Sequence, residues 1–483
     1  MKWLRLKDIG GITLSALFLT LAFRTSSFSF LAFIFLLPLL LVANSRKKAF
    51  FYFYFCGWLH YFLSLGWLAS VSKLGFILLV FYFALFWGLF GYLSWCFFSP
   101  SSLFGLSFLW VVMEYMRSYL LLGGFPWLII GYTQYRNLSF IQSADLLGAE
   151  FVSFLVIMAN FLIFTLLLKI RQKRQVWCFS LVSSLLVLLV SFSYGLLRLR
   201  EDFSSQGHLA VEVVQPAAPN SDSYIRRQQI VSDIIKLVKN TSPDRLVILP
   251  EAAFPFIVEN KYHLPLFALS RDIIVGALRQ EADSIYNSLF LFKFRKSQLE
   301  IYDKHHLVPF GEYVPGRRLL RFIEALNEIE NMRPGRDIRI LAYQKAKIGP
   351  LICFEDIFPL LVAREAERGA NVFVNITDES WFGGKEEMVQ HLQAAVFRAV
   401  EQRRFLIRSA NTGISCIITP WGYIRNFSSR LKHINRRDVL TANIFLCSFP
   451  TLYSKIKDSF VWFSFAVVLL IMVRRRRGYG CRN

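Results

Sequence analysis

The sequence predicts two parts with different folds, a domain of membrane-spanning helices and an α/β sandwich. The chain of 483 residues is 55% hydrophobic and contains 49 Phe, and its apolar runs are confined to residues 9–197 and 460–473. The segment between them has mixed polarity and alternates short apolar runs with helical patterns, as α/β domains do. We therefore divide the chain into a transmembrane domain of seven helices at 1–199, a soluble domain at 200–457, and a last helix with a basic tail at 458–483.

The apolar runs predict eight membrane spans, since about 20 apolar residues cross a bilayer as a helix. They lie at residues 9–23, 28–43, 49–68, 74–98, 103–122, 151–168, 176–197 and 460–473. More spans follow the first one, and no small-residue cleavage site does, so we do not interpret it as a cleaved signal peptide.

The Lys and Arg residues predict the orientation of these spans, because cytoplasmic loops are enriched in them. They cluster at 2–7, 46–48, 169–174 and 474–482, four places that alternate correctly with eight spans. The opposite short loops hold only Arg24, Lys73 and Arg136. Both termini are therefore predicted to be cytoplasmic, and the 200–457 domain to lie on the periplasmic side of a bacterial inner membrane. The net charge of +22 is largely explained in this way, and no nucleic-acid motif accompanies it.

The seven Cys residues do not suggest a disulfide framework, and no Cys/His cluster has zinc spacing. We expect neither a metal nor a cofactor. Three of them, Cys353, Cys416 and Cys447, lie in the domain predicted to be exported. A thiol that stays reduced in an oxidising compartment suggests a demand for the thiol itself.

Short β-type runs punctuate the soluble domain. They lie at 208–215, 245–251, 272–278, 287–294, 346–354, 370–377, 404–410, 414–420 and 439–445. Helical patterns lie between several of them, notably at 223–239 and 386–403. Nine strands with interleaved helices predict an α/β sandwich.

Three polar residues stand at the ends of these strands or in the loops that lead from them. Glu251 follows the strand of "LVILPEAAFP", where apolar neighbours would make its carboxylate a better proton acceptor. Lys304 lies in "YDKHHLVPFGEYVP", and a partly buried Lys can hold a thiolate and then an oxyanion by charge. Cys353 ends the strand of "GPLICFEDIFP", where the backbone is fixed and a nearby Lys would lower the thiol pKa from ~8.5.

Each of these residues alone also has an ordinary structural interpretation. The carboxylate could lie on the surface, the lysine in a solvated loop and the thiol in the core. The adjacent His305 and His306 invite a metal interpretation, but neighbouring side chains on a strand point to opposite faces. Together, however, the three residues supply a base, a cation and a thiol, which is the complement that covalent acyl chemistry needs.

The combination resembles the Glu-Lys-Cys triad of the nitrilase (carbon–nitrogen hydrolase) superfamily, whose domain is an αββα sandwich. Further motifs are similar to those of the apolipoprotein N-acyltransferase family. They are "SWFG" (380–383), "QHLQAAVFRAVEQRR" (390–404), "SANTGIS" (409–415) and, in the membrane part, Trp110, Glu114, Arg117, "GFPW" (124–127) and Gln134. The sequence departs from the family pattern at Leu249, where Trp is usual, at Phe354, where Tyr is common, and at Asp378 and Glu379, where Asn and Asp are expected.

The resemblance implies an acyl transfer in two stages. Cys353 would attack the ester of a membrane phospholipid and form a thioester, Glu251 would move the protons, and Lys304 would stabilise the oxyanion. The α-amino group of the diacylglyceryl-cysteine of an apolipoprotein would then take the acyl chain. By their positions in the motifs, Glu312 and Glu355 would orient the lysine and the pocket. The implied partners are thus a phospholipid donor and apolipoprotein acceptors.

Two other functions remain open at this level. A membrane-anchored amidase or nitrilase-type hydrolase would use the same triad with water as the acceptor. A transporter or membrane scaffold with an exported binding domain would need no special reactivity at Cys353. Within the membrane part, Glu114 and Arg117 are three residues apart on one helix face, which favours a structural ion pair over a lipid headgroup site.

Overall fold

The computed structural model describes residues 5–97, 103–121, 123–172, 178–203, 207–218, 224–259, 269–318, 329–382, 384–425 and 436–479. The chain divides into two compact units. Unit 1 comprises Met1–Glu201 and Ile456–Asn483, and unit 2 comprises Asp202–Lys455.

Unit 1 is helical. Its elements are α1 (Leu6–Arg24), η1 (Ser26–Phe33), α2 (Leu36–Val42), α3 (Arg46–Ser64), η2 (Gly66–Ser70), α4 (Lys73–Phe97), α5 (Leu103–Tyr119), η3 (Ile130–Gln134), α6 (Leu138–Ile141), α7 (Ala144–Leu147), α8 (Ala149–Gln172), α9 (Cys178–Arg198) and α15 (Ser459–Tyr479). Parts of α1, α4, α8 and α9 are long and apolar enough to cross a membrane, and shorter apolar helices lie at Ser26–Val42 and Ser459–Arg474. Helix α9 exposes Phe179, Val182 and Val190, as a lipid-facing helix does.

The predicted span at 28–43 is not one continuous helix. A 3-10 helix, η1, is followed by the short helix α2, with Pro38 in its first turn. Proline has no N–H for the preceding turn, and its ring collides with the carbonyl four residues earlier, so a helix cannot run through it undisturbed. Asn160 of α8 bonds the groups at this break, because its side chain accepts from Leu36 N (2.9 Å) and donates to Ala32 O (2.8 Å).

Glu114 and Arg117 of α5 are both buried, but each is bonded to other groups instead of to the other. The Glu114 carboxylate accepts hydrogen bonds from Ile130 N (2.8 Å) and from Trp110 Nε1 (3.4 Å). The Arg117 guanidinium donates to Trp127 O (2.8 Å). The expected direct pair is therefore replaced by two separate anchors, which hold the segment after α5 against that helix.

Unit 2 contains two β-sheets. The strands are β1 (His208–Gln215), β2 (Leu246–Ile248), β3 (Ile257–Val258), β4 (Ile273–Glu281), β5 (Ser284–Lys293), β6 (Gln298–Asp303), β7 (Leu341–Tyr343), β8 (Ala346–Ile352), β9 (Val372–Thr377), β10 (Leu406–Ala410), β11 (Cys416–Ile418), β12 (Ile424–Arg425) and β13 (Asp438–Phe445). The first sheet has the order β13-β1-β2-β4-β5-β6, with β3 paired to β4, and the second has the order β12-β11-β10-β9-β8-β7. The central strands of each sheet are parallel and the outer ones antiparallel.

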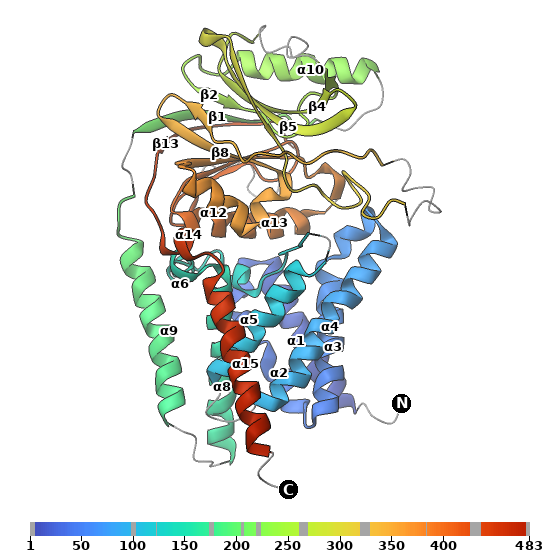
Figure 1. Ribbon diagram of the computed structural model, residues 1–483, viewed down its shortest axis with the longest axis vertical. Coiled ribbons are helices and arrows are strands. Elements are labelled where there is room, and N and C mark those ends of the chain that lie inside the picture. Colours follow the sequence, from blue (N-terminus) through green and yellow to red (C-terminus); the bar gives the residue numbers. More distant parts are fainter. Residues whose placement is uncertain are drawn as a thin grey trace. The chain divides into compact units, whose positions relative to one another are not determined.

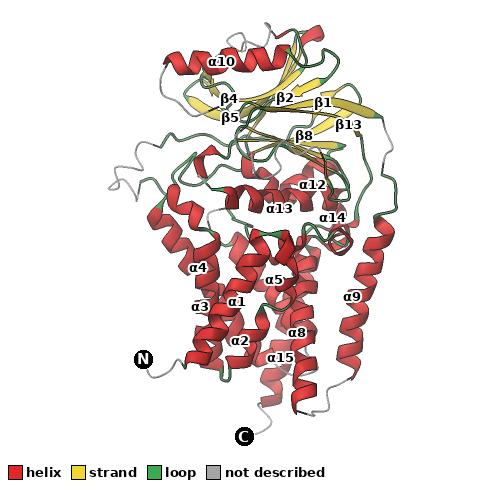
Figure 2. Ribbon diagram, turned by 180° about the vertical axis from the view of Figure 1, so that it is seen from behind, coloured by secondary structure: helices red, strands yellow, loops and turns green. Residues whose placement is uncertain are grey.

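Helices cover the outer faces of the two sheets. Helix α10 (Tyr224–Lys239) lies on the first sheet, and α12 (Pro359–Glu367) and α13 (Lys385–Gln402) lie on the second, while the inner faces of the sheets meet (Figure 1, and from behind in Figure 2). The short helix α14 (Leu452–Ile456) lies at the end of unit 2. Ile230, Ile234 and Val238 recur at helical spacing on α10 and pack against Val247 and Val275 of the first sheet. Unit 2 is thus an αββα sandwich.

Every predicted strand segment contains a strand, and both predicted helices exist as α10 and α13. The sequence did not predict β3, β6, β7 and β12. Three of these have only two or three residues. In β6 ("QLEIYD"), polar residues alternate with apolar ones, so the segment has no apolar run that would indicate a strand. The missed strand β6 matters, because it leads directly to Lys304.

Candidate active site

Glu251 lies just beyond β2, at the carboxyl end of the central parallel strands of the first sheet. Gly276 of β4 allows the backbone of Glu251 to lie close to this strand, since a Cβ at position 276 would lie 2.6 Å from Glu251 Cα. The carboxylate accepts hydrogen bonds from Asn287 Nδ2 (2.7 Å, to Oε1) and from Asp378 N (2.9 Å, to Oε2). Glu251 is therefore held by donors on both of its oxygens, with only 8% of its surface exposed.

Lys304 follows β6 and is 1% exposed. Its backbone is fixed by two hydrogen bonds, from Lys304 N to Asn287 O (2.9 Å) and from Gly335 N to Lys304 O (2.8 Å). Its ammonium lies 2.9 Å from Glu312 Oε1 and 3.5 Å from Glu251 Oε1. Burial alone would lower the pKa of Lys304, but the charges of Glu312 and Glu251 outweigh it and raise the pKa above its usual value. The ammonium is therefore a permanent cation between two carboxylates.

Cys353 directly follows β8 of the second sheet and adopts a left-handed backbone conformation, with φ at 54°. This conformation is unusual for a residue with a side chain, and Asn375 Nδ2 holds it by donating to Cys353 O (2.8 Å). Burial and then the charge of Glu251 raise the pKa of the thiol well above its usual value. Lys304 and the side chain of Thr377 lower it by less. The thiol is thus neutral at rest: the lysine lowers its pKa, as the sequence suggested, but burial and Glu251 outweigh this effect.

Glu355 joins the loop that carries Lys304 to the strand that carries Cys353. It is completely buried, and its carboxylate accepts from Tyr302 Oη (3.1 Å), His305 N (2.7 Å), His306 N (3.2 Å) and Ile352 N (2.8 Å). Burial raises the pKa of Glu355 to about 7, although the backbone N–H groups and the ammonium of the lysine oppose this shift. The carboxylate therefore fixes two sheets to each other at the site.

The structure brings the five predicted site residues into one region of unit 2. Glu251, Lys304 and Glu312 come from the first sheet and its loops, whereas Cys353 and Glu355 follow β8 of the second sheet. The ammonium of Lys304 contacts the carboxylates of both Glu251 and Glu312, and the charges of these three groups act on the thiol. The site can thus offer a proton acceptor, a fixed cation and a sulfur nucleophile to one substrate carbon.

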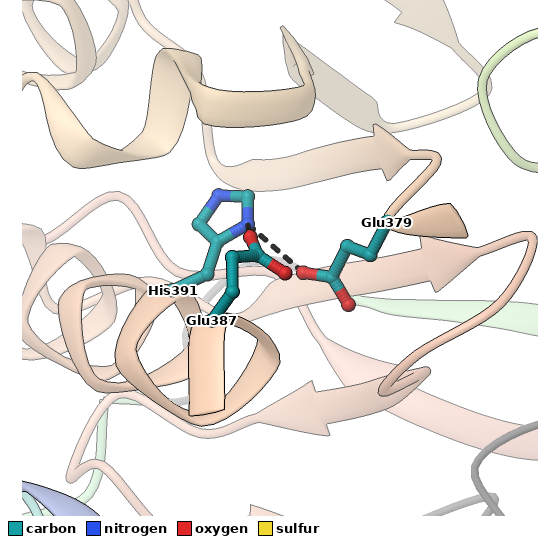
Figure 3. Close-up of side chains that lie close together, drawn as sticks. All are labelled: Glu379, Glu387 and His391. Carbon is teal, nitrogen blue, oxygen red and sulfur yellow. Dashed lines mark hydrogen bonds and ion pairs between the residues drawn. The ribbon is translucent and has the colours of Figure 1, made fainter. Parts of the chain in front are cut away.

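A second buried cluster lies beside the first and is shown in part in Figure 3, where the carboxylates of Glu379 and Glu387 lie near the ring of His391. His391 Nδ1 is 2.9 Å from Glu379 Oε1, and its Nε2 is 2.6 Å from Asp356 Oδ1. These ligand types suit a divalent cation. Arg408 takes this position instead, because its Nη2 contacts Glu379 Oε1 and lies 2.8 Å from His391 Nδ1, while its Nη1 binds Asp356 Oδ2 (2.9 Å). The guanidinium is therefore one cation that balances these carboxylates. The ring of His391 is a second, because although burial lowers its pKa, Asp356 and Glu379 raise it well above its usual value.

The groups that hold the predicted residues in place were not predicted from the sequence. Asn287 donates to both Glu251 and Glu312 at 2.7 Å, and Asn375 fixes the backbone of Cys353. Both asparagines lie in apolar strands, at positions where a polar side chain is buried. A polar residue at an inward position of a strand is the signal that could have found them.

Comparisons with known proteins identify the family of the chain. Residues 15–162 match the family model of the apolipoprotein N-acyltransferase N-terminal domain, and residues 213–444 match that of the carbon-nitrogen hydrolase domain. The chain is 35% identical over 400 residues to the apolipoprotein N-acyltransferase of Geobacter metallireducens, covering 78% of this chain and 75% of that protein. The chain belongs to the apolipoprotein N-acyltransferase family.

The apolipoprotein N-acyltransferase of Haemophilus influenzae is 29% identical over 450 residues, which cover 85% of this chain and 84% of that protein. Among solved structures, Saccharomyces cerevisiae Nit3, a member of branch 10 of the nitrilase superfamily, is similar with 19% identity and a TM-score of 0.38, covering 51% of this chain and 92% of that chain. Family membership and the apolar helices together indicate a membrane protein.

The departures from the apolipoprotein N-acyltransferase pattern can now be placed. Leu249 is fully buried in the core of the first sheet, so it does not line the site. The ring of Phe354 lies 5.5 Å from Lys304 Nζ, which preserves an aromatic contact with the cation. Asp378 gives its backbone N–H to Glu251, and Glu379 belongs to the cluster around the arginine.

Proposed function

We propose that this protein transfers a fatty acyl chain from a membrane phospholipid to the α-amino group of the N-terminal diacylglyceryl-cysteine of apolipoproteins. One observation carries the proposal. A single chain joins an apolipoprotein N-acyltransferase N-terminal domain to a carbon–nitrogen hydrolase domain in which Glu251, Lys304 and Cys353 converge. The named relatives align over most of their own length, which supports the same activity for the whole chain.

In the first stage, the sulfur of Cys353 attacks the ester carbonyl of the phospholipid. The thiol is neutral at rest, so its proton passes to the carboxylate of Glu251 as the S–C bond forms. The ammonium of Lys304 stabilises the oxyanion, and Glu312 at 2.9 Å holds that ammonium in place. The C–O bond then breaks, Glu251 returns the proton to the leaving lysophospholipid, and a thioester remains on the sulfur.

In the second stage, the free α-amino group of the apolipoprotein attacks the thioester. Glu251 accepts the proton that the amine loses, Lys304 again stabilises the oxyanion, and the C–S bond breaks. The proton returns to the sulfur of Cys353, and the N-acylated lipoprotein leaves. The reaction needs no cofactor, because the thioester preserves the reactivity of the acyl group.

We also propose that unit 1 spans the bacterial inner membrane eight times, with both termini in the cytoplasm and the catalytic unit in the periplasm. The alternation of basic residues supports this topology, and Figures 1 and 2 show the carboxyl ends of α8 and α15 at the same end of unit 1. Such a location suits the substrates, because moving their acyl chains out of lipid costs roughly 0.8 kcal/mol per CH₂.

The test is intact-mass analysis of the purified full-length protein, mixed with vesicles of phosphatidylethanolamine and phosphatidylglycerol. We expect an acyl adduct that maps to Cys353, is released by neutral hydroxylamine, and is absent from Cys353→Ala. Cys447→Ala is the matched control, since that thiol is also buried but lies outside the site. A wild-type protein that forms no adduct would overturn the proposal.

The fate of the adduct identifies the acceptor. We expect a synthetic peptide with an N-terminal diacylglyceryl-cysteine to remove the acyl group and to gain its mass, whereas an N-acetylated peptide does not. Loss of the acyl group to water at the same rate with either peptide would instead indicate a hydrolase with the same three residues.

A further inference from the structure

Thr377 is a buried residue whose hydroxyl has no use in the mechanism above. It is the last residue of β9 and is 0% exposed. Among the residues that the structure describes, its Oγ1 has no hydrogen-bond partner of normal geometry. A buried hydroxyl without a partner costs free energy, so its persistence in a site calls for a function.

The strand register places this hydroxyl beside the nucleophile. Strands β8 and β9 are parallel and Ile352 pairs with Ile376, so Cys353 and Thr377 each directly follow the last residue pair of this register. Successive side chains of a strand alternate between faces, so Asn375 and Thr377 share one face. The amide of Asn375 already contacts Cys353 O at 2.8 Å, which shows that this face is turned toward the cysteine.

We propose that Thr377 is a further catalytic residue, whose O–H donates a hydrogen bond to the sulfur of Cys353 whenever that sulfur carries negative charge. The inference rests on the proposed acyl transfer. In the first stage, as the proton of the thiol passes to Glu251 and the S–C bond forms, the threonine hydroxyl donates to the sulfur and stabilises the negative charge that the sulfur gains. In the second stage the same hydroxyl donates to the sulfur as the C–S bond breaks. The threonine keeps its own proton throughout.

The electrostatics of the site make such a donor valuable. Burial and the neighbouring Glu251 both oppose the thiolate, while Lys304 and Thr377 are the groups that favour it. The ammonium of Lys304 also contacts two carboxylates, at 2.9 and 3.5 Å, so they partly neutralise its charge and weaken its attraction for the sulfur. A hydroxyl that is already in place and not otherwise bonded can turn toward the sulfur without breaking another hydrogen bond.

The test compares Thr377→Val, which keeps the shape but removes the hydroxyl, with Thr377→Ser, which keeps the hydroxyl. The first measurement is the rate of alkylation of Cys353 by iodoacetamide as a function of pH, followed by peptide mass spectrometry. We expect the apparent thiol pKa to rise by about one unit or more in Thr377→Val, and Thr377→Ser to restore the wild-type value. The second measurement is the rate of thioester formation, which we expect to fall roughly ten-fold or more in the valine variant.

Thr419→Val is the control for the substitution itself, because this threonine is also buried but its hydroxyl accepts a hydrogen bond from Tyr423 N outside the site. We expect it to leave the thiol pKa unchanged. If valine at 377 leaves both the alkylation profile and thioester formation as in the wild type, the inference is wrong. If the valine shifts the thiol pKa but the wild type forms no acyl adduct, the role of the threonine stands and the proposed function fails. Should Thr377→Val not fold, as judged by thermal unfolding, Thr377→Ala is measured in the same way.

Discussion

Replacing Glu355 by Gln is the most informative single perturbation of this site. The carboxylate accepts four donors, and an amide of the same shape offers only one oxygen, so its NH₂ group would face a donor such as Ile352 N. One buried N–H left without an acceptor costs about 1–3 kcal/mol. The substitution also removes a buried charge. The shift of the pKa of Glu355 from 4.5 to about 7 corresponds to roughly 3 kcal/mol above neutral pH.

The two contributions oppose each other, so we expect the free energy of unfolding at pH 8 to change by less than about 2 kcal/mol. The reaction rate, in contrast, depends only on where the reacting groups lie, so no second effect offsets its loss. The loop that carries Lys304 and the end of β8 that carries Cys353 would separate, and a misplacement of about 1 Å costs about 100-fold in rate. The assay is the rate of thioester formation with phospholipid vesicles, together with thermal unfolding of the same samples.

Glu365→Gln is the matched control. Glu365 is also completely buried, and its pKa is raised well above the usual value, first by burial and then by the charge of Glu355. Neither of its carboxyl oxygens has a hydrogen-bond partner among the described residues, so it is protonated and an amide replaces it at little cost. A Glu355→Gln variant that forms the thioester as fast as Glu365→Gln would refute the reasoning.

The titration of Glu355 predicts how stability and activity depend on pH. Because the folded-state pKa of Glu355 is raised, its contribution to stability is complete below the unfolded pKa of 4.5 and is lost as the pH rises through about 7. Activity should follow the opposite direction, since the protonated acid cannot accept all four hydrogen bonds. We expect the rate of thioester formation to fall as the pH drops below about 7, and this decrease should disappear in Glu355→Gln.

Three further substitutions have defined outcomes. Glu312→Gln removes the carboxylate that raises the pKa of Lys304 most, and we expect thioester formation to slow by about 10- to 100-fold with little change in phospholipid binding. Gly276→Ala would place a Cβ 2.6 Å from Glu251 Cα, so we expect about 100-fold lower activity in a protein that still folds, as judged by circular dichroism. Arg408→Met removes a buried cation that contacts two buried carboxylates, and thermal unfolding should show a loss of about 3–5 kcal/mol; unchanged stability would contradict the role assigned to the guanidinium.

Most strands of unit 2 were predicted, because short apolar runs between polar segments indicate which residues are buried. Strand β6 was not predicted, since its alternating polar residues resemble a surface loop. The broken span at 28–43 was missed for a different reason. A hydropathy pattern averages over Pro38, but the missing N–H of this proline interrupts the hydrogen bonds of a helix.

The structure brings the predicted residues Glu251, Lys304 and Cys353 into one region, but the net electrostatics of the region were not predicted. The lysine was expected to lower the pKa of the thiol, and its charge does act in that direction. In the fold, burial and the carboxylate outweigh the lysine. The roles of Asn287 and Thr377 depend on strand pairing and on which face of a strand meets the other sheet. These are tertiary properties, so local sequence did not reveal them.

The division of the site between two sheets has a consequence for how the chain acquires its reactivity. A chain in which only one sheet has formed would hold either Glu251 and Lys304 without the sulfur of Cys353, or that sulfur without Glu251 and Lys304. Substitutions that loosen the packing of one sheet on the other, even at the far end of the sandwich, should abolish activity before they unfold the protein.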